Sequence, residues 1–144
     1  MKIEYVLGFM FDESLEHFVA LRKNKPEWQK GKLNGVGGKV EATDLGYPAA
    51  MSREFAEETG VEVPATNWKP VCNLHFEDAF VAVFACVGPI DLTNTTTEEE
   101  VYVLRAKGND LPYNALPNLR WLVPMSKNAL GATPTKTLDI FERP

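Results

Sequence analysis

One segment of the chain joins a glycine to a dense group of acidic residues, GKVEATDLGYPAAMSREFAEETGV at positions 38–61. Its carboxylates Glu54, Glu57 and Glu58 stand at spacings i, i+3 and i+4, which stack side chains on one face of a helix. Glu57 and Glu58 also fall in the last turn before Gly60, where the negative end of the helix dipole repels carboxylates. A helix built only for stability would carry lysines there, so the three glutamates indicate a function.

The opposite side of the same segment is apolar. Met51 and Phe55 fall there, which predicts an amphipathic helix beginning near Pro48. An isolated run of glutamates is ordinarily a solvated helical face. Here the clustered carboxylates suit a hard divalent cation that takes oxygen ligands, above all Mg²⁺, whose charge would cancel their repulsion. The upstream run NGVGGK at residues 34–39 adds backbone that can approach a ligand or offer a carbonyl to the metal.

Together, Gly38 and residues 53–61 resemble the signature of the Nudix hydrolases: Gly, five residues, Glu, seven residues, then Arg-Glu-aliphatic-x-Glu-Glu-x-Gly-aliphatic. Three positions depart from it. Asp44 stands where the first glutamate belongs, eight residues rather than seven separate it from Arg53, and Phe55 replaces an aliphatic residue. The extra residue precedes the helix, where a loop absorbs it without rotating the carboxylates. We therefore expect an intact metal cluster from which Asp44 is displaced.

The resemblance implies a magnesium site and a reaction. Mg²⁺, with Mn²⁺ as an alternative, would be held by the three helical glutamates and the carbonyl of Gly38, while Arg53 would orient the glutamates. Family members direct a water at a phosphorus of a nucleoside diphosphate linked to another group, X. We expect Glu57 to deprotonate that water. A glutamate outside the motif is the reserve, although the same run also fits a charged loop before an edge strand: Glu98, Glu99 or Glu100.

The sequence around the glycines also resembles the MutT-like hydrolases of oxidised purine nucleotides. In the mammalian type of that branch, an aromatic residue six positions before Asn-Gly-x-Gly-Gly-Lys lines the base pocket, and the asparagine bonds the purine edge. Trp28 and Asn34 occupy these positions. An asparagine offers a donor and an acceptor, and an indole offers a stacking surface. The expected substrate-binding residues are Trp28, Asn34, Gly37, Lys39 and Asn118.

Each of these residues also has a structural interpretation. Trp28 fits equally a loop tryptophan that caps the core, and Asn34 fits a turn before a glycine. Three cations are candidates for the phosphates, and each also fits an ordinary surface charge: Arg22, Lys32 and Lys39.

Three functions follow. The first is a Mg²⁺-dependent pyrophosphohydrolase that cleaves a purine or 8-oxo-purine nucleoside triphosphate to the monophosphate and pyrophosphate. The second is a Nudix enzyme for ADP-ribose or a dinucleotide, against which the Asn34 segment weighs. The third is a non-catalytic nucleotide sensor, which has no need to keep a self-repelling cluster of glutamates.

The composition of the chain further limits its domain organisation and its binding partners. With 144 residues, 44% of them hydrophobic, the chain suits one domain over 1–144, able to bury about two-thirds of its unfolded surface. A formal charge of −5 and a pI near 5.1 argue against a nucleic-acid polymer as partner and leave a small nucleotide compatible. No leader-like start or membrane span is visible, so we expect a cytoplasmic monomer or homodimer.

The sequence contains no residue pattern typical of zinc binding or of other catalytic chemistries. Cys72 and Cys86 have no zinc-site spacing and lie in strand-like runs, which predicts buried reduced thiols. His17 and His75 are isolated from any nucleophile. The sequence holds no P-loop, HExxH or GxSxG motif.

Hydrophobic patterning predicts a mixed α/β fold. Strands are expected at residues 2–11, 17–23, 33–40, 70–77, 79–87 and 101–105, and helices from Pro48 and over 123–130. Strands interspersed with two helices indicate a mixed β-sheet covered on both faces. This three-layer α/β/α sandwich is also the fold that the Nudix resemblance implies.

Overall fold

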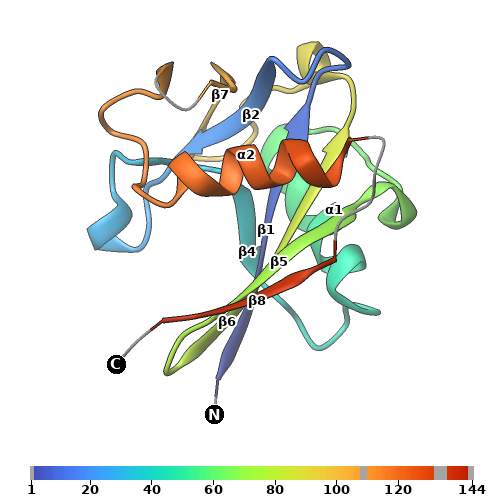
Figure 1. The fold of residues 1–144 in the computed structure, drawn as a ribbon, viewed down its shortest axis with the longest axis vertical. Coiled ribbons are helices and arrows are strands. Elements are labelled where there is room, and N and C mark those ends of the chain that lie inside the picture. Colours follow the sequence, from blue (N-terminus) through green and yellow to red (C-terminus); the bar gives the residue numbers. More distant parts are fainter. Residues whose placement is uncertain (1, 108–109, 132–135, 143–144) are drawn as a thin grey trace.

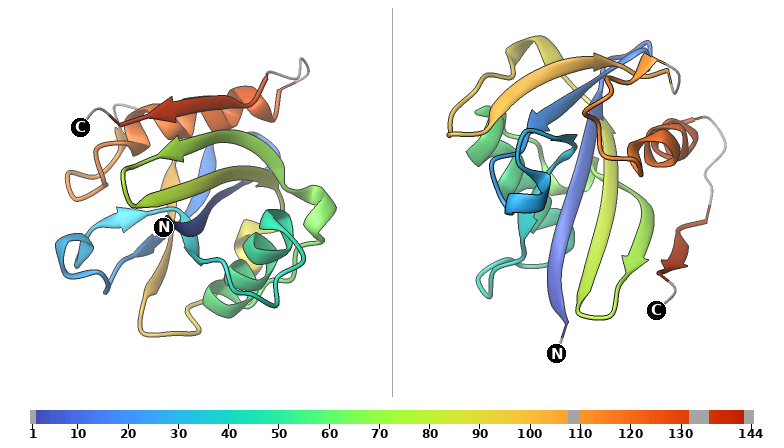
Figure 2. Two further views of the ribbon diagram at one scale, coloured as in Figure 1. Left: turned by 90° about the horizontal axis from the view of Figure 1, so that it is seen from below. Right: turned by 90° about the vertical axis from the view of Figure 1, so that its left-hand side faces the viewer.

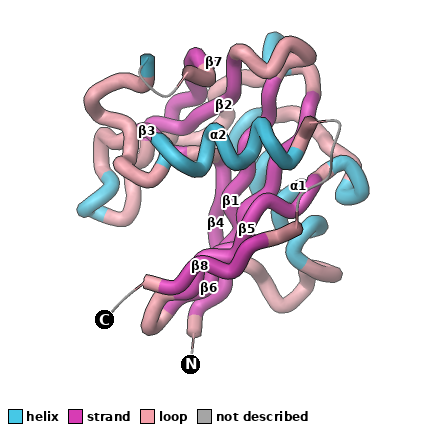
Figure 3. Tube along the Cα trace, viewed as in Figure 1, coloured by secondary structure: helices cyan, strands magenta, loops and turns pink. Residues whose placement is uncertain are grey.

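The computed structural model describes residues 2–107, 110–131 and 136–142. Within them, two α-helices lie on opposite faces of a mixed β-sheet (Figures 1 and 3). The elements are β1 (Ile3–Phe11), β2 (His17–Arg22), β3 (Leu33–Asn34), β4 (Val36–Lys39), α1 (Tyr47–Thr59), β5 (Lys69–His75), β6 (Ala79–Val87), β7 (Glu100–Arg105), α2 (Leu119–Ala129) and β8 (Leu138–Phe141). Short 3-10 helices are η1 (Glu27–Gln29), η2 (Ala65–Asn67) and η3 (Ile90–Leu92).

The sheet is organised around β1. Its described strands follow the order β3-β2-β1-β6-β5-β8, with β4 also paired to β1 and β7 to β2. β1 and β6 run parallel along their whole length. The glycine-interrupted strand expected over 33–40 proves to be two strands, because the chain changes partner at Gly35: Asn34 pairs with β2, and Val36 pairs with β1. This switch brings the glycine run of β4 beside α1.

Two separate apolar clusters fill the space on either side of the sheet. Phe9 and Phe11 of β1 belong to the cluster that includes the buried residues of α2. Val6 and Met10, which alternate with them, belong to the cluster that contains Met51 of α1. Figure 2 shows the two helices on opposite sides of the strands. The predicted three-layer α/β/α sandwich is therefore confirmed.

The second helix begins earlier than the sequence suggested. The prediction placed this helix over 123–130, whereas α2 begins at Leu119. Pro124 lies inside this helix, where its missing N–H removes one backbone hydrogen bond. The helix continues through it because the preceding turn buries two leucines, Leu119 and Leu122, completely against the sheet.

Two further features bear on the sequence predictions. β8 was not predicted; it pairs parallel to β5 at the edge of the sheet. Cys72 and Cys86 are free and buried as expected, and burial raises their thiol pKa to about 11 and about 12. Neither of the helices in the described part of the chain is long and apolar enough to cross a membrane.

Candidate metal and nucleotide site

The helix α1 is set by glycines at both ends. Gly46 precedes it with φ 135° and ψ 175°, a backbone conformation that side chains rarely allow. Gly60 ends it in the left-handed region with φ 77°, and its N–H donates to the carbonyl of Ala56 at 2.9 Å. The extra residue of the motif is absorbed next to Gly46, so the helix keeps its glutamates in the expected register.

Glu54 is the buried member of the carboxylate group. Its side chain points from α1 toward β4, and the residue is 9% exposed. A Cβ at Gly38 would lie 2.5 Å from the carboxyl carbon of Glu54, so only glycine leaves room for this carboxylate. Burial raises the pKa of Glu54, and the neighbouring charges of Glu57 and Glu58 raise it further, against the lowering effect of Arg53.

Arg53 lies among four carboxylates. Its Nη1 donates to Glu54 at 3.0 Å and lies 2.8 Å from an oxygen of Glu41 and 3.3 Å from Glu57. These contacts raise the pKa of Arg53, with the hydrogen bonds to Asp44 as the largest cause. The guanidinium thereby offsets the repulsion that the sequence analysis identified. Glu41 had no role in the sequence predictions.

Asp44 is not displaced from the site, contrary to the sequence prediction. It accepts two hydrogen bonds from Arg53, from Nε and from Nη2, each at 2.9 Å, in the bidentate geometry that arginine and carboxylate favour. Its side chain is 6% exposed. The prediction failed because the extra residue follows Asp44 and is taken up by Leu45 and Gly46, so Asp44 keeps its place. The hydrogen bonds from Arg53 hold the pKa of Asp44 below its ordinary value.

Glu57 and Glu58 occupy the outer part of the same helix face. The side chain of Glu57 is 53% exposed. Oε2 of Glu58 accepts a hydrogen bond from Thr97 at 2.6 Å. Thr97 was missed by sequence reasoning, because a threonine 39 residues away gives no local signal for this contact.

The oxygen ligands available at this site are of the type that a hard divalent cation binds. Three carboxylates and the backbone of Gly38 supply only oxygen, the ligand type that Mg²⁺ prefers. The space left by Gly38 holds the Glu54 carboxylate next to that backbone. Within the described residues, no three acidic, histidine or cysteine side chains already surround one position. In this arrangement Arg53 contacts both Glu54 and Glu57, and one oxygen of Glu58 accepts a bond from Thr97.

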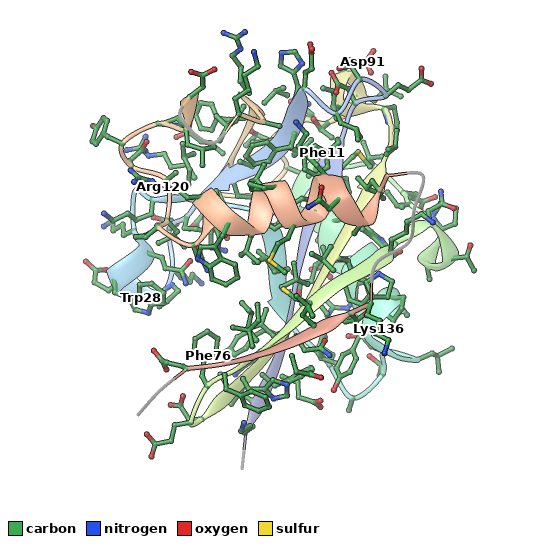
Figure 4. All side chains as sticks on the ribbon, in the orientation of Figure 1. Phe11, Trp28, Phe76, Asp91, Arg120 and Lys136 are labelled. Carbon is green, nitrogen blue, oxygen red and sulfur yellow. The ribbon has the colours of Figure 1, made fainter. Side chains whose placement is uncertain are left out.

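The expected base-binding residues differ in their surroundings. Trp28 lies on η1 and is 69% exposed, so it does not cap the core (Figure 4). Asn34 accepts the N–H of Gly35 at 2.8 Å through its own Oδ1. Asn118 immediately precedes α2, and its Oδ1 is buried without a hydrogen-bond partner in the described residues. Gly37 pairs with β1, and Lys39 is exposed at the end of β4.

Backbone pairing brings two of these residues to neighbouring segments. The N–H of Leu33 donates to the carbonyl of Asn114 at 3.0 Å, and the N–H of Leu116 donates back to Leu33 at 2.9 Å. The chain just before Asn118 therefore runs beside β3, which carries Asn34. Among the described residues, no interaction joins Trp28 to Asn34 or to Asn118.

The acidic run before β7 fits the expected charged loop before an edge strand, because β7 pairs only with β2 among the described strands. Its glutamates tie β7 to the end of β2: Glu99 bonds Lys23 at 3.2 Å, and Glu100 lies 3.5 Å from Arg22. The same region borders an open cavity of about 430 Å³, lined by three cationic and two acidic side chains. Its lining consists of Arg22, Lys23, Asn24, Lys30, Gly31, Glu98 and Glu100.

Comparison with known proteins identifies the family. The profile of the Nudix domain matches residues 1–122. The chain therefore belongs to the Nudix family of hydrolases. No curated protein sequence matches the chain significantly.

Solved structures support the same fold at low identity. A MutT/Nudix family protein from Enterococcus faecalis has a TM-score of 0.73 at 12% identity, over 90% of this chain and 62% of that one, so this chain spans less than two thirds of its length. MutT from a study of Aliivibrio salmonicida and Vibrio cholerae has a TM-score of 0.70 at 20% identity, covering 90% and 98%. The Nudix domain of Shewanella oneidensis NrtR, solved with ADP ribose, has a TM-score of 0.74 at 12% identity, covering 91% and 90%.

Proposed function

We propose that the chain is a Mg²⁺-dependent pyrophosphohydrolase of purine nucleoside triphosphates, releasing the nucleoside monophosphate and pyrophosphate. One observation carries this proposal. Helix α1 presents three glutamates on one face, and the buried carboxylate of Glu54 lies against the backbone of Gly38 where a side chain would not fit. Arg53 offsets part of this negative charge, and the glutamate oxygens supply the ligand type that a divalent cation prefers.

Each residue of the site has a distinct task in this proposal. Glu54, Glu57 and Glu58 would hold the metal together with the carbonyl of Gly38. The bound cation would neutralise phosphate charge and lower the pKa of a bound water. Arg53 keeps Glu54 and Glu57 oriented through its Nη1. Glu57, the most exposed of the metal-side oxygens, accepts the proton of the attacking water.

The base side supports a purine with N–H groups on its edge. The buried Oδ1 of Asn118 lacks a donor, and a ligand N–H would satisfy it. Asn34 lies on the neighbouring segment, where its amide N–H groups can bind a base carbonyl. A guanine or 8-oxoguanine edge offers both kinds of group. Lys30, which lines the cavity beside β2, is a candidate contact for the phosphates.

A second candidate substrate is ADP-ribose. The NrtR Nudix domain that was solved with ADP ribose has the same fold over 91% of this chain. Both reactions would use the same glutamates, and they differ in what occupies the far side of the pyrophosphate. The proposed contact of Asn34 with a base carbonyl favours a guanine-type triphosphate, because the adenine of ADP-ribose has no carbonyl.

The experiment is a nucleotide panel with Mg²⁺ and product analysis by chromatography. The panel contains dGTP, 8-oxo-dGTP, dATP, ATP, ADP-ribose and a dinucleotide. We expect the purine triphosphates to be cleaved fastest, with monophosphate and pyrophosphate as products. Faster cleavage of ADP-ribose would assign the second function. A panel with no Mg²⁺-dependent product at all would reject both.

A further inference from the structure

The segment between η3 and β7, residues 93–99, crosses the C-terminal end of the catalytic helix. The N–H of Asn94 donates to the carbonyl of Thr59 at 2.9 Å, and the hydroxyl of Thr96 donates to the carbonyl of Glu57. Both carbonyls belong to the last turn of α1, which has no further helical partners. The 93–99 segment therefore caps the helix that carries the glutamates.

The next residue of the segment contacts a glutamate side chain. Thr97 donates its hydroxyl hydrogen to Oε2 of Glu58 at 2.6 Å. The direction of this bond is fixed, because Thr97 Oγ1 also accepts the N–H of Glu99 at 3.1 Å and a carboxylate can only accept. A glutamate on an exposed helix face otherwise samples several rotamers. Glu58 is thus held in one orientation by a residue from another element.

The same segment is fastened on its other side to the end of β2. The carboxylate of Glu99 accepts the backbone N–H of Asn24 at 2.7 Å and lies 3.2 Å from Nζ of Lys23, and the Lys23 and Glu99 side chains are mostly buried. Lys23 and Asn24 also line the open cavity beside β2. A continuous chain of contacts therefore runs from the cavity through Glu99 and Thr97 to Glu58.

From this chain of contacts we propose that Thr97 is a positioning residue for Glu58, and that the buried Lys23–Glu99 pair holds Thr97 in place. The inference rests on the proposed function, in which Glu58 is a metal ligand. Hydrogen bonds from outer residues orient metal ligands and reduce the freedom lost when the ion binds. Thr97 touches neither the substrate nor the metal in this scheme. Its effect is on the affinity of the site for the cation.

The test compares Thr97→Val with Thr97→Ser and with the matched control Thr96→Val. Valine keeps the shape of threonine and removes the hydroxyl, serine keeps the hydroxyl, and Thr96 bonds a backbone carbonyl rather than a carboxylate. Mn²⁺ binding to the nucleotide-free protein is measured by electron paramagnetic resonance, with thermal unfolding as the check of folding. We expect Thr97→Val to weaken Mn²⁺ binding about tenfold, while the other two variants stay within about twofold of the wild type.

A double-mutant cycle with Glu58→Gln separates a positioning role from a general loss of structure. If Thr97 acts through Glu58, Thr97→Val has no further effect on Mn²⁺ affinity in the Glu58→Gln background. Equal affinities of Thr97→Val and Thr96→Val, or equal losses in Thr97→Val and Thr97→Ser, would overturn the inference. The proposed function survives those results if the wild type still binds Mn²⁺ and cleaves nucleotides. It fails, together with the inference, if the wild type does neither.

Discussion

Arg53 determines how the carboxylates of this site are arranged. It bonds Asp44 with two nitrogens and uses a third for Glu54 and Glu57. Because the guanidinium stays charged at all relevant pH values, it holds the acidic residues together before any metal binds. The glutamates are therefore prepared for a cation without needing one to fold.

Glu57 offers the sharpest test at the level of a single residue. We expect Glu57→Gln to lower kcat by about a hundredfold or more, because it removes a charged ligand and the proposed base. Stability should change little, since the side chain is 53% exposed. The measurement is single-substrate kinetics with Mg²⁺, and Glu62→Gln, an exposed glutamate outside the site, is the control. Near-normal activity in a folded Glu57→Gln variant would reject the metal-site assignment.

Asp44 calls for a different expectation from the one that the sequence suggested. A displaced aspartate would make Asp44→Ala mild compared with Glu57→Gln. The observed bidentate contact with Arg53 removes the basis for that expectation, so we now expect Asp44→Asn to lower activity substantially by loosening Arg53. The kinetic assay used for Glu57 measures this directly. Wild-type rates in Asp44→Asn would show that Arg53 is held without Asp44.

Asp44 also predicts a pH dependence of stability. Arg53 lowers its pKa in the folded state, so its contribution is fully present above the ordinary value of 3.8 and is lost as pH falls through the lower folded value. The wild type should exceed Asp44→Asn in unfolding free energy at pH 7 and pH 5, and the difference should shrink toward pH 2. Urea unfolding at these pH values measures it. A difference that stays constant down to pH 2 would contradict the ion pair.

Asn34 and Trp28 should act on nucleotides in different ways. Asn34→Ala removes contacts to a base edge, worth roughly 1 to 3 kcal/mol of discrimination, and should flatten the preference among purine nucleotides. Trp28→Ala removes an exposed stacking surface worth roughly 1 to 3 kcal/mol per base and should weaken the binding of all nucleotides equally. Values of kcat/KM across the panel measure both. If neither variant changes them while ADP-ribose is cleaved faster, the second function replaces the first.

At the level of elements, the periodicity of the sequence predicted helices and strands best where neighbouring residues alone determine the local structure. The expected helix near Pro48 is α1, since its apolar and acidic faces and its two glycine ends all agree. The start of α2 was predicted four residues late, because the burial of Leu119 is a tertiary effect. β8 is short and exposed at a sheet edge, so its hydrophobic pattern was weak.

The loop before α1, which absorbs the extra residue of the motif, can be tested by substitution. Gly46 has φ 135°, and a Cβ there would meet nothing closer than 3.9 Å, so any cost of a side chain comes from the backbone. We expect Gly46→Ala to destabilise the fold by about 1 to 3 kcal/mol in urea unfolding. Gly60→Asn is the comparison, because φ 77° is accessible to asparagine and should cost less. Equal effects of the two variants would contradict this explanation.

At the level of the whole molecule, the sequence indicated the layers and the site helix, and the long-range contacts required the structure. The strands interspersed with two helices were enough to predict a sheet covered on both sides, and β1 has buried apolar residues on both faces. The bond from Thr97 to Glu58, the pairing of β3 with the segment before Asn118, and the contact of Glu41 with Arg53 join residues whose separation leaves no periodic signal.

The divalent-metal site on α1 can be tested directly with crystals soaked in Mn²⁺ and an anomalous difference map. We expect a peak in direct contact with oxygens of Glu54, Glu57 and Glu58 and beside the carbonyl of Gly38. The side chain of Arg53 should move away from Glu57 and keep its two bonds to Asp44. An ordered site without a peak at saturating Mn²⁺, or a peak bound only by residues elsewhere, would contradict the assignment of this helix as the metal-binding element.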